Sequence, residues 1–165
     1  MKVAITGTPG TGKTRVAKKL GSALGFPVID LNSLLVKEYA LGRDIDRDTT
    51  VVDIYRASRT IKLPGDCVVD GHLSHFLGAD VVVVLRCKPG ELRRRLRNKG
   101  WAEEKVRENA EAEALNIISL EARENNKRVF DIDTTEKSVN EVVEEIIKAI
   151  KENRPDEGLD FLEFL

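Results

Sequence analysis

The segment Gly7-Thr8-Pro9-Gly10-Thr11-Gly12-Lys13-Thr14 matches the pattern G-x-x-x-x-G-K-[ST] at every position. The apolar run at residues 3–6 predicts a buried strand before it, and apolar residues at helical spacing predict a helix over residues 15–24. A glycine-rich turn between a strand and a helix directs backbone N–H groups and the positive end of the helix dipole at a phosphate. The sequence therefore predicts an α/β protein with a phosphate-binding loop after its first strand.

The residue types in this loop assign roles to individual positions. Gly10 and Gly12 allow backbone N–H groups to turn inward, and we expect Lys13 to reach the β and γ oxygens of ATP. The Thr14 hydroxyl is the expected ligand of Mg²⁺, for which a second oxygen ligand is needed. Asp70 ends the predicted strand Cys67–Asp70 and is the candidate for that ligand; the alternative is that Asp70 caps the next turn.

Strands and helices alternate along the rest of the chain, which predicts a parallel sheet covered by helices. Further strands are expected at residues 27–29, 67–70, 81–85 and 128–132, and helices at 31–41, 51–63, 89–97, 103–124 and 138–151. Asn32 or Ser33 is the expected cap of the helix 31–41, and the polar segment 42–50 is predicted to be a loop. The tail after Pro155 mixes acidic and apolar residues, so it is either a docking segment or frayed.

Composition limits the class of protein. The chain has 165 residues, which predicts one domain over 1–165, and its hydrophobic share of 41% is enough for a core. A net charge of −1 argues against a dedicated nucleic-acid binder that relies on bulk charge. No apolar run approaches the ~20 residues that cross a bilayer. Two cysteines make a secreted disulfide scaffold a poor fit, so we expect a cytoplasmic protein.

Several short motifs carry a resemblance to a known family. They are GTPGTGKT at 7–14, VVDGH at 68–72, VLR at 84–86, KGW at 99–101, ENAEAE at 108–113 and IDTT at 132–135. In their order and spacing the chain resembles adenylate kinase isoenzyme six, the CINAP-type proteins, and in particular their archaeal relatives, over about residues 1–152. The resemblance implies a P-loop nucleoside-monophosphate-kinase fold with a five-stranded parallel sheet of order 2-3-1-4-5, flanked by helices, and a short lid.

The resemblance also implies an activity. It implies transfer of the ATP γ-phosphate to AMP with Mg²⁺, giving two ADP, together with ATP hydrolysis. It further implies a role in rRNA processing and late maturation of the small ribosomal subunit, with the eleventh small-subunit protein (a platform protein) and pre-ribosomal RNA as partners. Two alternatives stay open: a ribosome-assembly ATPase or chaperone with weak kinase activity, and a small-metabolite kinase.

The same resemblance implies site residues. Those implied to bind ATP are Gly10, Gly12, Lys13, Thr14, Arg15 and, on the lid, Lys99. The monophosphate-binding segment is implied at about 30–53, the lid at about 98–108, and a C-terminal tail at 153–165. Where relatives can carry an arginine, this chain has Val36 followed by Lys37. Lysine offers a point charge instead of a two-pronged guanidinium, so this departure bears on AMP affinity and selectivity.

Four further residues each have a candidate role. His72 lies two residues past Asp70, where it is a candidate for orienting the attacking group; the alternative is a packed or exposed histidine in a turn. Arg95 is our candidate for contacting substrate phosphates among the arginines before the lid. Arg86 either meets phosphate or forms an ion pair. Trp101, the only tryptophan, either covers the site or packs as a hinge.

Overall fold

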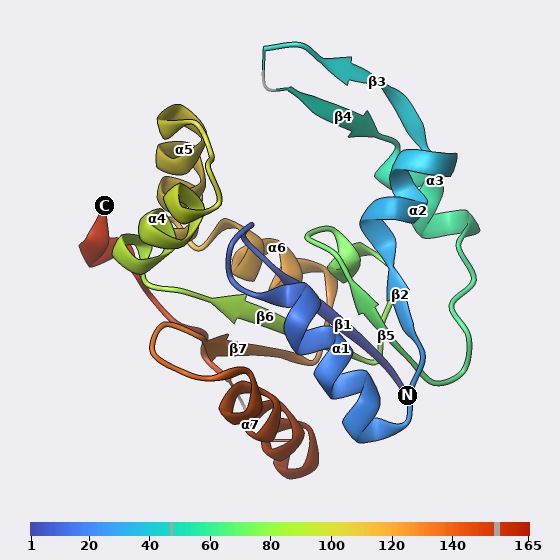
Figure 1. Ribbon diagram of the computed structural model, residues 1–165. Coiled ribbons are helices and arrows are strands. Elements are labelled where there is room, and N and C mark those ends of the chain that lie inside the picture. Colours follow the sequence, from blue (N-terminus) through green and yellow to red (C-terminus); the bar gives the residue numbers. More distant parts are fainter. Residues whose placement is uncertain (47, 154–155) are drawn as a thin grey trace.

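The computed structural model describes residues 1–46, 48–153 and 156–165, and its centre is a five-stranded parallel sheet (Figure 1). The strands lie in the order β2 (Val28–Asp30), β5 (Cys67–Asp70), β1 (Lys2–Gly7), β6 (Val81–Arg86) and β7 (Val129–Asp133). Counted along the chain among these five strands, the order is 2-3-1-4-5, so the predicted topology is confirmed. The carboxyl ends of β1 and β5 are neighbours, because Ile5 pairs with Asp70.

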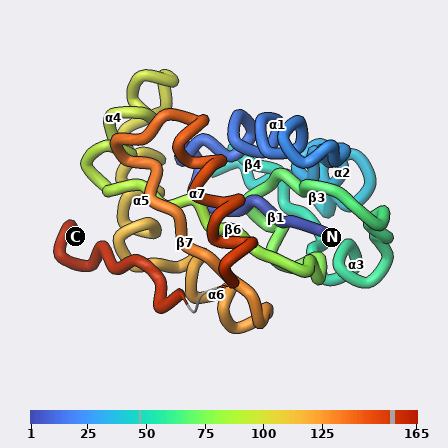
Figure 2. The backbone as a smooth tube through the Cα atoms, turned by 90° about the horizontal axis from the view of Figure 1, so that it is seen from below, coloured from blue at the N-terminus to red at the C-terminus, as the bar shows by residue number. Residues whose placement is uncertain are grey.

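Helices cover both faces of this sheet. Helices α1 (Lys13–Leu24) and α7 (Val139–Glu152) pack on one face, and α6 (Ile117–Asn125) packs on the other with the short helix η1 (Ser74–Phe76). Figure 2 shows α1 and α6 on opposite sides of the strands. Alternate residues of β1 serve the two cores: Val3 and Ile5 lie in the core under α1 and α7, and Ala4 lies in the core under α6. Burial on both faces explains why the inner strands β1, β5 and β6 contain continuous apolar runs.

The segment after β2 differs from the prediction. Helix α2 spans Leu31–Glu38, and its cap is Asp30, whose carboxylate accepts from the Ser33 N–H at 3.0 Å; the expected caps Asn32 and Ser33 are wrong. The predicted loop at 42–50 and the start of the helix predicted at 51–63 form an antiparallel hairpin, β3 (Ala40–Asp44) and β4 (Thr49–Val52). The β-branched residues of β4 favour this extended conformation.

The hairpin projects away from the central sheet, on the side of the molecule where α4 and α5 lie (Figure 1). Helix α3 (Ile54–Thr60) follows it and is capped by Asp53, whose carboxylate accepts from the Arg56 N–H at 2.9 Å. Together, α2 and the hairpin make up most of the implied monophosphate segment at about 30–53, and α3 begins just after it; position 47 of that segment lies outside the described residues.

Helices α4 (Pro89–Asn98) and α5 (Glu103–Ala114) form a helical hairpin around the implied lid. Gly100 has a φ of 76° and ends α4: its N–H bonds the Arg97 carbonyl at 2.8 Å, and the Trp101 N–H bonds the Leu96 carbonyl at 3.2 Å. This pair of bonds is a Schellman motif, which only a residue tolerant of positive φ closes readily. The four residues 99–102 are thus a tight turn between two packed helices.

The single helix predicted over 103–124 is wrong, because the chain breaks between α5 and α6. Asn116 has a φ of 57° at the break, and its side chain accepts from Arg86 at 2.6 Å and donates to Asp160 at 3.0 Å. Tertiary hydrogen bonds therefore override a local sequence that favours a continuous helix.

The C-terminal residues dock on the body of the protein. Of the two alternatives for the tail, docking is correct for residues 156–165; positions 154 and 155 lie outside the described residues. The Leu159 N–H donates to Asp131 at 3.0 Å, Phe161 is buried, and a short helix η2 (Leu162–Phe164) follows. Helix η2 contacts α5. Among the described residues, none of the helices combines the length and the apolar character that a membrane span requires.

Candidate nucleotide-binding site

The loop between β1 and α1 has the backbone shape that its sequence predicts. Gly7 has a φ of 137° and Gly10 a φ of 94°, and any Cβ at Gly7 would collide with the Leu85 carbonyl. A Cβ at Gly10 would lie 2.9 Å from both Leu92 and Leu96, so the loop packs directly against α4. Helix α1 begins at Lys13 without a hydrogen bond from any described side chain to its first turn. Its N-terminal N–H groups are therefore available for an anion.

Lys13 lies under this loop as a half-buried cation. Its Nζ donates to the carbonyl of Gly7 at 2.8 Å and to that of Thr8 at 3.1 Å. Burial lowers the pKa of Lys13 from 10.5 to about 8, an effect that Asp70 opposes and Lys99 reinforces. An incoming phosphate would reverse that penalty by supplying negative charge, and Lys99 is near enough to act on the same charge.

Asp70 and Thr14 meet beside Lys13. Burial raises the pKa of Asp70, and a hydrogen bond from Thr14 and the Lys13 charge oppose the rise. The described residues contain no group of three or more His, Cys, Asp or Glu side chains that would bind a metal by themselves. The hydroxyl of Thr14 and the carboxylate of Asp70 nevertheless fit Mg²⁺, which keeps most of its water and takes one or two protein oxygens plus substrate phosphates. Thr14 and Asp70 are thus the residues that would hold it.

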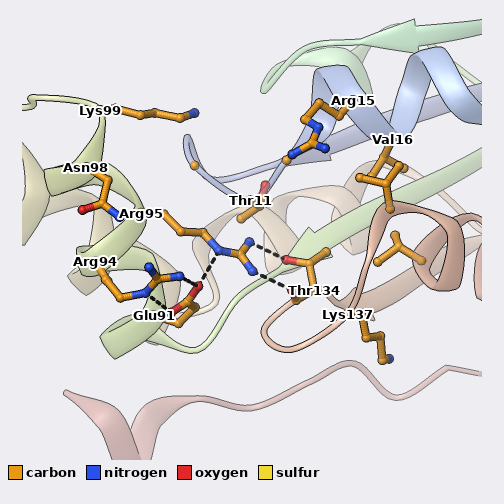
Figure 3. Close-up of a pocket in the computed structure, with 14 residues that line it drawn as sticks. Thr11, Arg15, Val16, Glu91, Arg94, Arg95, Asn98, Lys99, Thr134 and Lys137 are labelled. Carbon is orange, nitrogen blue, oxygen red and sulfur yellow. Dashed lines mark hydrogen bonds and ion pairs between the residues drawn. The ribbon is translucent and has the colours of Figure 1, made fainter.

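A pocket of about 450 Å³ opens on the β6–β7 side of the loop (Figure 3). Its walls come from the phosphate loop, α1, α4 with the residue after it, and the segment between β7 and α7 with the start of α7. They are Gly10, Thr11, Gly12, Arg15, Val16, Glu91, Arg94, Arg95, Asn98, Lys99, Thr134, Lys137, Val139 and Val142. The walls include five residues predicted from the sequence to bind ATP or a phosphate: Gly10, Gly12, Arg15, Arg95 and Lys99.

Arg95 is a wall residue whose guanidinium is already engaged. It donates to Glu91 at 2.9 Å, to the Thr134 carbonyl at 2.7 Å and to the Thr135 carbonyl at 3.1 Å (Figure 3 draws the bonds to Glu91 and Thr134). These contacts brace the loop after β7 against α4. The structure therefore gives Arg95 a role in holding the pocket wall, and its predicted contact with a substrate phosphate stays a prediction.

His72 lies on the other side of the loop, next to α2. Its Nδ1 is 3.1 Å from Oδ1 of Asn32, and because an amide oxygen only accepts, this contact places a proton on Nδ1. Loss of hydration beside the surrounding protein lowers the pKa of His72 below its ordinary value, and the Lys13 charge lowers it further. A neutral ring with Nδ1 protonated leaves Nε2 as a hydrogen-bond acceptor.

The remaining predicted residues lie further out. Lys37 is exposed in the last turn of α2 and lies outside the walls of the 450 Å³ pocket. Trp101 is 36% exposed in the lid turn, which settles neither of its two alternatives. Arg86 forms buried ion pairs with Glu113 at 2.7 Å and Asp131 at 2.8 Å, so the ion-pair alternative is correct. A second cavity, lined by Asp44, Asp46, Glu104, Lys105 and Glu108, lies between the hairpin and α5.

Two residues that were not predicted to belong to the site contact it. Asn32 orients His72, and Glu113 accepts a hydrogen bond of 2.5 Å from Thr8 in the phosphate loop. Helical spacing carried a signal for Glu113, because Val106, Ala110 and Glu113 fall on one face of α5 and all are buried.

Comparisons with known proteins agree with this geometry. Residues 3–116 match the family model described as an AAA domain. The chain is 43% identical to a protein of Thermococcus onnurineus described as "Putative adenylate kinase", over 92% of this chain and 84% of that protein. It is also 43% identical to a protein of the same description from Natronomonas pharaonis, over the whole of both chains. A gluconokinase from Sinorhizobium meliloti shares the fold, with a TM-score of 0.63, 15% identity and 92% of each chain covered. The chain therefore belongs to the same family as these archaeal adenylate-kinase-like proteins, a family of P-loop nucleotide kinases.

Proposed function

We propose that the protein transfers the γ-phosphoryl group of ATP to AMP, forming two ADP. The observation that carries this proposal is the arrangement of parts around the phosphate loop. The 450 Å³ pocket lies on the β6–β7 side of the loop, whereas α2 and the hairpin follow β2 on the opposite side. A donor nucleotide with its base in the pocket would extend its phosphates along the loop toward an acceptor held by α2 and the hairpin.

The proposed catalytic groups lie at the phosphate loop, between the pocket and the segment that follows β2. Lys13 and Lys99 supply positive charge to the phosphoryl group while it is transferred. No covalent intermediate is needed, because phosphoryl transfer depends on positioning and charge neutralisation. Thr14 and Asp70 would hold Mg²⁺, which would supply further charge neutralisation to the phosphate oxygens. Lys37 is the proposed point charge for the acceptor phosphate.

Steady-state ADP formation with a panel of acceptors tests the proposal. The panel contains AMP, CMP, GMP, UMP, small hydroxylated acids and no acceptor. We expect the highest rate with AMP, loss of that rate in Lys13→Ala, and retention in Lys19→Ala, which removes an exposed lysine from the same helix. A rate that no monophosphate increases would contradict the proposal, and a preference for a hydroxylated acid would favour the small-metabolite kinase.

ATP hydrolysis is the second candidate, with a role in small-subunit ribosome maturation. The neutral His72 ring with a free Nε2 favours hydrolysis, because it could accept a proton from a water molecule that attacks the γ-phosphate. An exposed apolar surface favours a protein partner: Leu115 and Ile117 at the α5–α6 break and Leu162 and Leu165 at the C-terminus are each more than 40% exposed. The Asn116–Asp160 hydrogen bond brings these two segments together.

By the resemblance, the partners would be the platform protein of the small subunit and pre-ribosomal RNA. Calorimetric titration with the purified platform protein tests this candidate, with Leu162→Ser and Ile117→Ser expected to weaken binding and Tyr55→Ser, an exposed change on α3, expected to leave it unchanged. Absence of binding by the wild type would remove the candidate.

A further inference from the structure

Glu113 is a buried carboxylate that touches the phosphate loop from outside the nucleotide pocket. It lies in the last turn of α5 and is 2% exposed. One carboxylate oxygen accepts from Arg86 Nε at 2.7 Å and from the Cys87 N–H at 3.0 Å, and the other accepts from Thr8 Oγ1 at 2.5 Å. A buried carboxylate requires such partners, so the three bonds fix its orientation.

Thr8 is the point at which the loop closes on itself. Its carbonyl accepts from Thr11 Oγ1 at 2.9 Å, from the Thr11 N–H at 3.3 Å and from Lys13 Nζ at 3.1 Å. Its side chain is directed to Glu113, and the residue is 2% exposed. The position of Thr8 therefore helps to set both the curve of the loop and the place of Lys13.

Arg86 holds Glu113 from the far side. Its guanidinium also donates to Asp131 at 2.8 Å and to the Leu159 carbonyl at 2.8 Å, and the Phe161 ring covers it at 5.0 Å from the ring centre. A continuous set of contacts thus runs from the docked C-terminal segment through Arg86 and Glu113 to Thr8.

We propose that Glu113 is a positioning residue for nucleotide binding: through Thr8 it holds the phosphate loop in the shape that accepts phosphate oxygens. The inference rests on the proposed function only in requiring that the loop bind a nucleotide, and it holds for any phosphate acceptor. It assigns no contact between Glu113 and the nucleotide.

The test removes the hydrogen bond between Thr8 and Glu113 and leaves the Glu113 carboxylate in place. Thr8→Val keeps the shape of the side chain and deletes its hydroxyl, and Thr8→Ser keeps the hydroxyl. Affinity for ADP with Mg²⁺ is measured by calorimetry, and thermal unfolding is recorded for each variant. We expect Thr8→Val to raise the Kd for ADP about tenfold, because a buried carboxylate oxygen loses its partner and the loop relaxes. Thr8→Ser should restore the wild-type Kd.

Ser119→Ala is the matched control. Ser119 donates to both oxygens of Asp131 at 2.9 Å. The change therefore also deprives a buried carboxylate in the same set of contacts of a hydroxyl donor, but away from the phosphate loop. We expect it to lower the unfolding temperature without changing the Kd for ADP.

Two results would overturn the inference: an unchanged Kd in Thr8→Val, or an equal rise in Thr8→Val and Ser119→Ala, which would indicate general loosening. If Thr8→Val does not fold, Thr8→Ala is compared in the same way. A wild type that binds ADP yet phosphorylates no monophosphate would refute the proposed function and leave this test intact.

Discussion

Replacing Lys13 with methionine should abolish turnover and yet stabilise the nucleotide-free protein. Methionine has a similar length and no charge, so it removes the cation without opening a large cavity. The pKa of Lys13 falls from 10.5 to about 8 on folding because of burial, which corresponds to a cost of about 3 kcal/mol for keeping the proton in the folded state. The variant loses the two hydrogen bonds to the Gly7 and Thr8 carbonyls, worth about 1 kcal/mol each.

The removed cost of about 3 kcal/mol exceeds the loss of about 2 kcal/mol from the two hydrogen bonds. Lys13→Met should therefore gain about 1 kcal/mol in the free energy of unfolding at pH 7, or about 2–4 °C in Tm for a chain of this size. The gain depends on pH in a defined direction. Below pH 8 both the folded and the unfolded chain keep the proton, and the wild type carries the full cost. Between pH 8 and 10.5 the folded chain binds fewer protons than the unfolded chain, so the wild type becomes more stable as the pH rises, and the advantage of the variant shrinks.

Thermal unfolding of the wild type, Lys13→Met and Lys19→Met at pH 7 and pH 9.5 measures this effect. Saturating ADP should reverse the order, because a ligand present at 100 times its Kd stabilises a protein that binds it by about 2.7 kcal/mol and leaves a non-binding variant unchanged. A variant that is less stable than the wild type at pH 7 without nucleotide, or a difference that does not shrink at pH 9.5, would refute the reasoning.

Three further predictions follow from the site and the docked tail. Asp70→Asn should impair both ATP hydrolysis and AMP phosphorylation. His72→Gly should reduce ATP hydrolysis more than AMP phosphorylation, because an attacking water molecule needs orienting and a bound acceptor phosphate does not. ADP formation with and without AMP measures the two reactions, and equal losses of both in His72→Gly would contradict the role of His72. The fluorescence of Trp101 should change on binding ATP or a bisubstrate dinucleotide as the lid closes, and a flat titration with binding confirmed by calorimetry would remove it from the lid. Phe161→Ala should lower the free energy of unfolding by about 3 kcal/mol, because Phe161 is 5% exposed and covers Arg86; urea denaturation measures the loss, and an unchanged stability would show that the tail is not docked in solution.

The sheet and the phosphate loop could be predicted because local sequence determines them. The inner strands β1, β5 and β6 are buried on both faces and appear as short apolar runs, and the glycines of the loop are needed for its positive φ angles. The hairpin at β3 and β4 was missed for the opposite reason. Its residues are largely exposed, and its pairing between Ala40 and Val52 depends on a partner strand and not on a core. The β-branched run of β4, Thr49–Val52, is the available signal, but the boundary between the predicted loop at 42–50 and the predicted helix at 51–63 divides it.

The break between α5 and α6 and the hydrogen bonds of Glu113 share one cause, which is a buried arginine distant in the sequence. Both depend on Arg86, a cation buried at the end of β6 with 1% of its surface exposed. Such a group is stable only if fixed partners surround it, and here they come from α5, the helix break, β7 and the C-terminal segment, up to 73 residues away in the sequence. Asn116 leaves the helical conformation to reach Arg86, and Glu113 turns inward between Arg86 and Thr8. The phosphate loop is therefore held by a motif that the sequence displays and by a buried ion pair that only the fold assembles.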